Sequence, residues 1–217
     1  MRLRILYEKA GILLGFVPLI VYGILAGNSV SSVVTALGAA TVVTVIAGFF
    51  DLRKGMILMW TTLVLFGGTF IAVGVLDMTG IIPFMGMLIY AILAAVTFGS
   101  ILVKTPFTLQ YAREMVDRAL WENPFFIRVN ILMTGVWGGV FVINLLLSYL
   151  TFASPHSVGW ITSPLTYLIL IAGIIFTVWY PRHLQKKHSF ASGLVAVTYN
   201  IMPGATGGIE MDLKVKV

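Results

Sequence analysis

The sequence of 217 residues contains no cysteine. This absence excludes disulfide bonds, thiolate metal sites, iron–sulfur clusters, thiol catalysis and a cysteine-linked lipoprotein anchor. Charge is scarce as well, because Asp, Glu, Lys and Arg make up 10% of the chain against about 25% of a soluble domain. Hydrophobic residues make up 59%. This composition excludes both an ordinary cytosolic protein and a disordered chain.

Groups that could carry chemistry are few. The three histidines are His156, His183 and His188; the last two are five residues apart among basic residues, whereas a metal site needs converging ligands. The sequence also lacks a G-x-S-x-G elbow, a P-loop, an H-E-x-x-H motif and paired catalytic carboxylates. We therefore expect no catalytic residue, no metal site and no cofactor.

The chain does contain long apolar stretches. A helix that crosses a bilayer needs about 20 apolar residues, and six stretches come near this length: 10–27, 30–50, 56–76, 81–103, 127–150 and 161–180. The sequence predicts an all-α polytopic membrane domain over residues 1–188 with six transmembrane helices. Their interiors contain no ionisable side chain, since Arg128 lies at an end. This argues against proton- or cation-coupled transport but leaves a facilitator for neutral solutes open.

The net charge of +6 follows from topology rather than from nucleic-acid binding. All 14 Lys and Arg residues lie in the N-terminal arm, in the loops after the second and fourth stretches, or in the C-terminal tail. The three alternate loops contain none. The positive-inside rule then predicts a multi-pass protein of the inner membrane with both termini in the cytoplasm, where the basic residues face an anionic leaflet.

The polar interval 104–124 predicts an interfacial helix over 106–122. Thr105 is a suitable N-cap, and apolar residues recur with helical spacing from Ala112 to Leu120. Two i,i+4 ion pairs, Arg113 with Asp117 and Glu114 with Arg118, would stabilise its polar face. The segment is a connector or a surface that docks a protein partner. The candidate docking residues are Arg113, Glu114, Asp117, Arg118 and Trp121.

The fifth apolar stretch carries a polar face. Asn130, Trp137 and Asn144 recur every seven residues, and Thr134 lies nearby. Buried amides in membrane helices usually form hydrogen bonds to neighbouring helices. The face therefore packs against another helix or lines a ligand site.

The tail 189–217 predicts a cytoplasmic β-hairpin. Residues 209–217 alternate strictly between apolar and charged, and residues 194–201 are rich in β-formers. The intervening Pro203-Gly-Ala-Thr-Gly-Gly208 has the composition of a turn. An isolated hairpin is marginally stable, so we expect its apolar face to rest on the bundle, on a second copy or on another protein.

The order of short motifs resembles the intracellular septation protein A family of bacterial inner-membrane proteins. The motifs are Phe16-Val-Pro-Leu19, Thr62-Leu-Val-Leu-Phe-Gly-Gly68, Lys104-x-Pro-Phe107 and Trp137-Gly-x-x-Phe141, within residues 14–182. The resemblance implies a non-enzymatic protein that contacts division and elongation machinery in septum formation and envelope integrity. The predicted hairpin departs from the family pattern, in which the chain ends soon after its last span.

The leading hypothesis is an integral inner-membrane protein that acts through protein contacts in cell-envelope maintenance or septum formation. One alternative is a facilitator, transporter or small-molecule binder that uses the polar face of the fifth stretch. Another is an accessory subunit of a larger membrane complex. A homo-oligomer is compatible with each of them.

Overall fold

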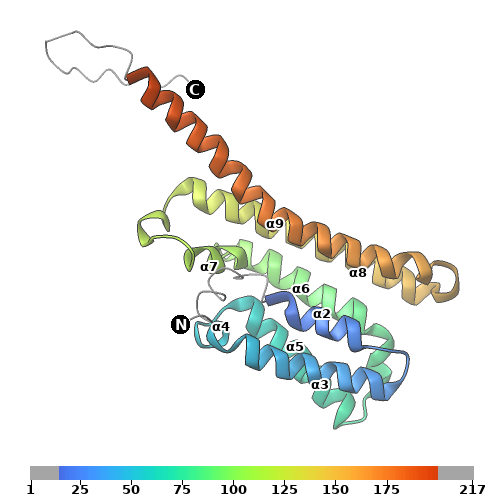
Figure 1. Cartoon of the computed structure of the whole chain (residues 1–217). Helices are drawn as coiled ribbons and strands as arrows, with labels where there is room; N and C mark the ends of the chain where they lie inside the picture. The colour runs from blue at the N-terminus through green and yellow to red at the C-terminus, as the bar shows by residue number, and fades with distance from the viewer. Residues whose placement is uncertain (1–14, 200–217) are drawn as a thin grey trace, which may run out of the picture. The chain divides into compact units, whose positions relative to one another are not determined.

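A computed structural model describes residues 15–199, and within them all side chains except His156, Arg182 and residues 185–199. The described chain divides into a unit that ends at Thr177 and a second unit that begins at Val178. Every regular element in residues 15–199 is a helix. The elements are α2 (Val17–Leu25), α3 (Val30–Ala47), α4 (Phe49–Arg53), α5 (Ile57–Gly74), η2 (Thr79–Phe84), α6 (Met85–Leu102), α7 (Phe107–Arg113), η3 (Arg118–Leu120), α8 (Pro124–Ala153) and α9 (Pro155–Tyr199) (Figure 1).

Five of these helical segments are long and apolar enough to cross a membrane: Val30–Ala47, Ile57–Gly74, Thr79–Leu102, Pro124–Ala153 and Ser157–Pro181. They correspond to the second to sixth predicted spans, so the prediction of a multi-pass helical membrane protein is confirmed. The first predicted span begins outside the described residues. Its described part, α2, has nine residues. The first span, and with it the count of six, therefore stays a prediction.

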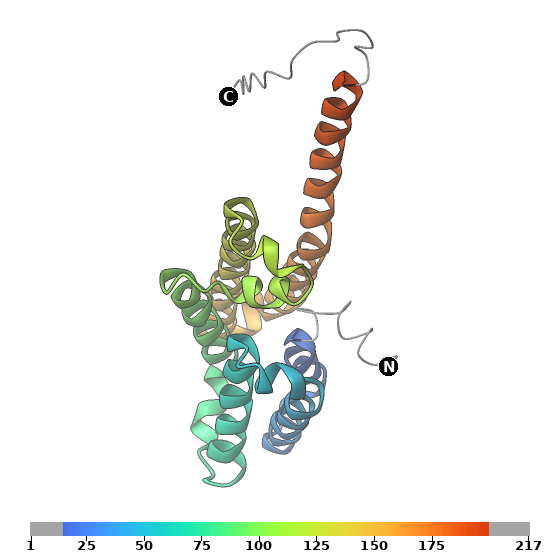
Figure 2. The ribbon, with the colours of Figure 1, turned by 90° about the vertical axis from the view of Figure 1, so that its left-hand side faces the viewer.

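Three helix pairs make the most extensive contacts in the first unit. Helix α2 lies against α3, α3 against α5, and α6 against α8 (Figures 1 and 2). Their shared core contains the fully buried side chains of Leu37, Phe66, Trp137 and Phe141. Close approach requires small residues, because a Cβ on Gly38 would lie 3.1 Å from the Phe70 ring.

Helix starts are fixed by local hydrogen bonds. Ser29 and Ser32 form a capping box at the start of α3, in which each side chain accepts from the other residue's backbone N–H. The Asn123 side chain caps α8 by accepting from the N–H of Phe125 at 2.8 Å. Pro124 follows at the first helical position, where the lack of an N–H costs nothing.

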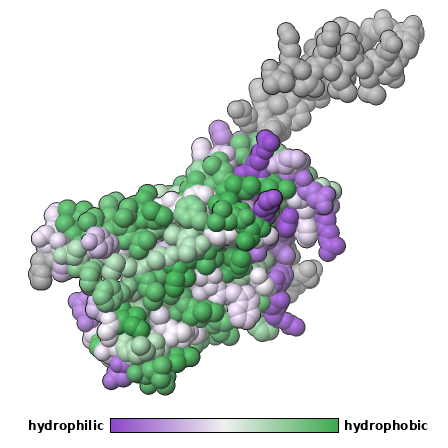
Figure 3. Space-filling view, turned by 180° about the vertical axis from the view of Figure 1, so that it is seen from behind, coloured by the Kyte–Doolittle hydropathy of each residue, from purple (hydrophilic) through white to green (hydrophobic). Residues whose placement is uncertain are grey.

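The surface of these helices is apolar over most of the face shown in Figure 3. Individual side chains are highly exposed, including Ile46 at 73%, Val64 at 68% and Leu102 at 81%. Contiguous exposed apolar surface of this kind is rare on soluble proteins. It is the surface expected of helices that face lipid tails.

The structure corrects the interfacial helix predicted over 106–122. Two short helices occupy this interval, α7 and η3, and they are separated by a turn. The break has a physical cause, because Asp117 adopts an extended conformation and its carboxylate accepts from the N–H of Ala119. The Trp121 indole N–H donates to the Arg113 carbonyl at the end of α7. In a continuous helix this carbonyl would instead accept from a backbone N–H of the next turn.

The structure also differs from the predicted C-terminal hairpin. Helix α9 continues through Tyr199, so residues 194–199 are helical where the first strand was predicted. The difference has a simple cause, because a short run rich in β-branched residues is compatible with either a strand or a helix. The second predicted strand, 209–217, lies outside the described residues.

Candidate functional site

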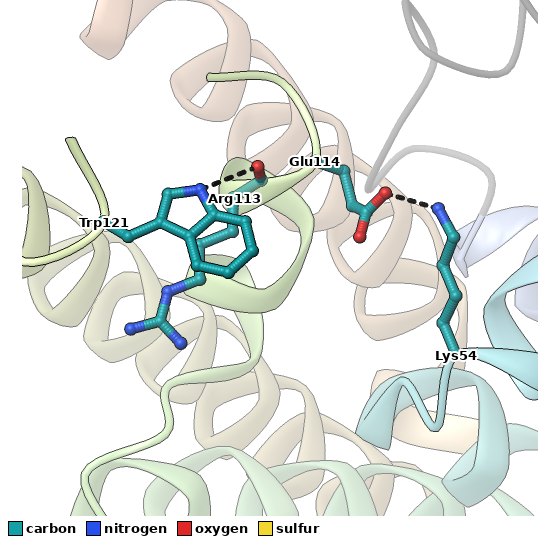
Figure 4. A network of polar contacts seen from close by, with 4 residues as sticks. All are labelled: Lys54, Arg113, Glu114 and Trp121. Carbon is teal, nitrogen blue, oxygen red and sulfur yellow. Dashed lines mark hydrogen bonds and ion pairs between the residues drawn. The ribbon is translucent and has the colours of Figure 1, made fainter. Parts of the chain in front are cut away.

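The candidate site lies at the basic end of the bundle, where the α4–α5 turn meets α7. The Lys54 ammonium forms an ion pair with the Glu114 carboxylate, and Figure 4 shows the two side chains pointing toward each other. Beside this pair, the Gln110 side-chain oxygen accepts from the N–H of Ile57 at 2.9 Å. These contacts join segments that are more than fifty residues apart in the chain.

Helix α7 is anchored by the burial of its first two turns. Phe107, Leu109 and Tyr111 are 1%, 2% and 4% exposed. The N–H of Phe107 donates to the Ser100 hydroxyl at 3.2 Å, and the Thr108 hydroxyl donates to the Asn130 carbonyl at 2.8 Å. The helix is thus held against the ends of α6 and α8.

Asp51 is the most unusual group of the site. Its side chain in α4 is completely buried, and neither carboxylate oxygen has a hydrogen-bond partner among the described residues. The Tyr111 hydroxyl is also buried and faces the Asp51 carboxylate closely enough to affect its ionisation, although the two groups do not reach ideal hydrogen-bond geometry. The backbone packs tightly here, because a Cβ on Gly15 would lie 3.3 Å from this hydroxyl.

Burial controls the ionisation of this pair. Burial, reinforced by the nearby Glu114 charge and opposed by Lys54 and the Tyr111 hydroxyl, raises the pKa of Asp51 from 3.8 to about 6. Burial and the Asp51 charge also raise the pKa of Tyr111 well above its usual range. The Asp51 carboxyl can therefore bind or release a proton near neutral pH.

The predicted docking residues gather around one indole ring. The guanidinium groups of Arg113 and Arg118 lie 5.4 and 5.6 Å from the Trp121 ring, and Figure 4 shows the indole N–H bonded to the Arg113 backbone. Glu114 pairs with Lys54 rather than with Arg118, the partner that local spacing predicted. Asp117 is exposed and caps η3.

The structure places the polar face of α8 inside the protein. Asn130, Thr134, Trp137 and Asn144 are 3%, 0%, 1% and 0% exposed. The Trp137 indole N–H donates to the Thr177 hydroxyl at 2.9 Å, and the indole stacks on Phe16 with ring centroids 4.1 Å apart. The Thr134 and Thr108 hydroxyls are 2.7 Å apart.

These four residues line neither the cavity between α2, α6, α8 and α9 nor the groove along α5 and α6. The Asn144 amide has no hydrogen-bond partner among the described residues. In the part of the chain that the structure describes, no three His, Asp or Glu side chains come together as metal ligands.

Comparison with known proteins identifies no relative. No family model, no curated protein and no solved structure matches the chain. The resemblance to the septation protein A family therefore remains a prediction from motif order.

Sequence reasoning missed Asp51, Lys54 and Tyr111. The only signal for Asp51 is an acidic residue directly after an apolar stretch, which is also where a solvated loop residue would lie. Tyr111 falls within a segment whose polar residues suggested an exposed helix. Their proximity depends on the packing of α4 against α7, which local patterns do not reveal.

Proposed function

We propose that this chain is a multi-pass protein of the bacterial inner membrane that acts through protein contacts at its basic end, without catalysis of its own, in cell-envelope maintenance or septum formation. The distribution of basic residues over alternate loops supports a cytoplasmic location for both termini and for residues 107–121. The order of short motifs supports the role in the envelope. The five apolar helices support the membrane location.

The observation that carries the proposal is the contrast between the two halves of segment 107–121. Its first half is buried and bonded, whereas Met115 is 59% and Leu120 45% exposed. Both lie among charged side chains, including Asp117 and Arg118. Because the segment is anchored, a partner that binds these side chains causes a smaller loss of conformational entropy. Met, Arg and aromatic residues are also enriched at protein interfaces.

Site-specific photo-crosslinking in living cells tests this surface. A benzophenone amino acid is placed at Met115 or Leu120, and at Met78, a matched methionine that is 51% exposed in the loop after α5. We expect one adduct of defined mass from Met115 and Leu120, absent from Met78. Mass spectrometry should identify a membrane or cytoplasmic protein of the envelope or division machinery.

A complementation experiment tests whether the crosslinked surface is needed for function. In cells that lack the gene, Met115→Lys with Leu120→Lys should accumulate in the membrane at the wild-type level but fail to restore normal envelope or septum morphology. Met78→Lys should restore it. Equal adducts from all three positions, or full rescue by the double variant, would overturn the proposal. An adduct to a subunit of a stable membrane complex would instead favour the role of an accessory subunit.

A further inference from the structure

One cavity of the described structure lies between α2, α6, α8 and α9, away from the basic end. It has a volume of about 780 Å³, within the range of roughly 300–1,000 Å³ that is typical of small-molecule sites. Its walls come from α2, α6, the end of α8 and the first half of α9, all within the first unit. Pro83 and Pro155 place its outer end at the loops that contain no Lys or Arg.

The lining is mainly apolar, with hydroxyl groups gathered near one end. The hydroxyl residues Ser148, Ser163 and Thr166 lie toward the outer end, whereas Leu19, Leu170 and Ile174 lie deeper in the bundle. Among the described residues, no side chain that lines the cavity is charged. A charged ligand would therefore be left without a counter-charge in a medium of low dielectric constant, which is strongly unfavourable. The cavity selects an uncharged amphiphile.

The cavity is elongated. Its α9 wall runs along one helix face from Ser163 to Ile174, a distance of about 16 Å at the usual helical rise. A wall of this length accommodates an extended hydrocarbon chain. Lipid hydrocarbon chains are also the main component of the bilayer around these helices.

Two tyrosine hydroxyls supply an independent indication of a ligand. Tyr90 lines the cavity and is only 8% exposed, and none of the hydrogen bonds in residues 15–199 involves its hydroxyl. Tyr22 on α2 also lines the cavity; it is partly buried, and its hydroxyl has no hydrogen bond within residues 15–199 either. By contrast, Tyr167 donates to the Gly23 carbonyl at 3.1 Å. A hydroxyl without a hydrogen-bond partner is costly in an apolar medium, so a ligand acceptor in the cavity would stabilise Tyr90.

The second cavity provides a comparison. It lies along α5 and α6, with a volume of about 490 Å³. Its polar groups are already bonded within the protein: Thr61 and Thr69 donate to their own helix, and the Trp60 indole N–H donates to the Leu52 carbonyl. That groove offers ordinary contact with bulk lipid and no specific hydrogen bond.

We propose that the cavity between α2, α6, α8 and α9 binds one neutral membrane lipid, with its hydrocarbon chain along α9 and an ester or hydroxyl group at Tyr90 and Tyr22. The ligand class is a single-chain uncharged glyceride. This site is independent of the protein contacts proposed at the basic end, which it neither requires nor explains.

Photo-labelling of the purified full-length protein in nanodiscs tests the site. The probe is a monoacylglycerol with a diazirine in its acyl chain, compared with a diazirine fatty acid and a diazirine phosphatidylglycerol. We expect the neutral probe to label peptides of α9 and α2, and the two anionic probes to label these peptides much less. Removal of one hydroxyl by Tyr90→Phe should reduce labelling about 2- to 10-fold, the loss of one hydrogen bond.

Matched variants separate the cavity from bulk lipid. Thr166→Phe fills the cavity and should abolish labelling, whereas Leu168→Phe, at a 61% exposed position outside the lining, should leave it unchanged. If Thr166→Phe does not fold, Ser163→Phe, at an exposed position of the same wall, replaces it. Equal labelling of the filled and unfilled proteins, or equal labelling by the anionic probes, would overturn the proposal.

Discussion

The Lys54 ammonium and the Glu114 carboxylate form an ion pair that joins the α4–α5 turn to the end of α7. Both side chains are about two-fifths exposed, at 41% and 43%. Exposed ion pairs usually contribute up to about 1 kcal/mol. The pair therefore orients α7 more than it stabilises the fold, and it holds the exposed part of segment 107–121 next to the bundle.

A double-mutant cycle with Lys54→Met and Glu114→Gln should give a coupling free energy of at most about 1 kcal/mol at low salt. Thermal unfolding in detergent micelles measures it. The coupling should shrink in high salt, because exposed charges are screened. Glu122→Gln, an exposed carboxylate close to the same segment, is the matched control and should show no coupling to Lys54. A coupling above about 3 kcal/mol would show that the pair is desolvated in the membrane interface.

Asp51→Asn should stabilise the protein at pH 8. The pKa of Asp51 is about 6 in the folded state and 3.8 ordinarily, so the folded protein retains a proton that the unfolded chain releases between these values. Stability therefore falls as pH rises through this window, and the full penalty is present above pH 6. The variant removes it, a gain of roughly 2–3 kcal/mol.

The difference between Asp51→Asn and the wild type should disappear below about pH 3, where the carboxyl is protonated in both states. Unfolding midpoints measured from pH 3 to 8 test this. Asp77→Asn, at an exposed position, is the control for the substitution itself and should change the unfolding midpoint little. A variant that is less stable than the wild type at pH 8 would indicate that the Asp51 charge has a partner.

Gly48 should be intolerant of a side chain, unlike Gly68. A Cβ at Gly48 would lie 2.4 Å from both the Thr44 carbonyl oxygen and the Met59 sulfur, whereas a Cβ at Gly68 would meet nothing within 4 Å. Gly48→Ala should therefore destabilise the protein by about 1–3 kcal/mol. Gly68→Ala, in the middle of α5, should be neutral or stabilising by about 0.5–1 kcal/mol. Equal unfolding midpoints for the two variants would contradict this packing between α3 and α5.

The sequence predicted what depends on length and local composition. Five apolar stretches became helices with nearly the expected bounds, because each must satisfy its own backbone hydrogen bonds over the thickness of a bilayer. The start of α8 three residues before the predicted span also has a local cause, because the Asn123 amide and the missing N–H of Pro124 act within one turn.

Relations between distant segments could not be predicted. Spacing along one helix paired Glu114 with Arg118, but the partner is Lys54, sixty residues away. The cavity was missed for the same reason, since four helices each contribute a few lining residues and none of those groups is unusual by itself. Asn130, Trp137 and Asn144 share a helix face as the spacing predicts, but the spacing did not distinguish packing from ligand binding.

Replacement of Trp137 decides between these two roles. The indole is 1% exposed, stacks on Phe16 and donates to Thr177, so we expect Trp137→Ala to cost roughly 3–5 kcal/mol of folding stability. Thr177→Val, which removes only the acceptor, should cost about 1 kcal/mol. Trp160→Ala, at a 73% exposed position, is the control and should change stability little. If Trp137→Ala left the unfolding midpoint unchanged, the indole would not be a packing element, and the polar face of α8 would regain its interpretation as a ligand site.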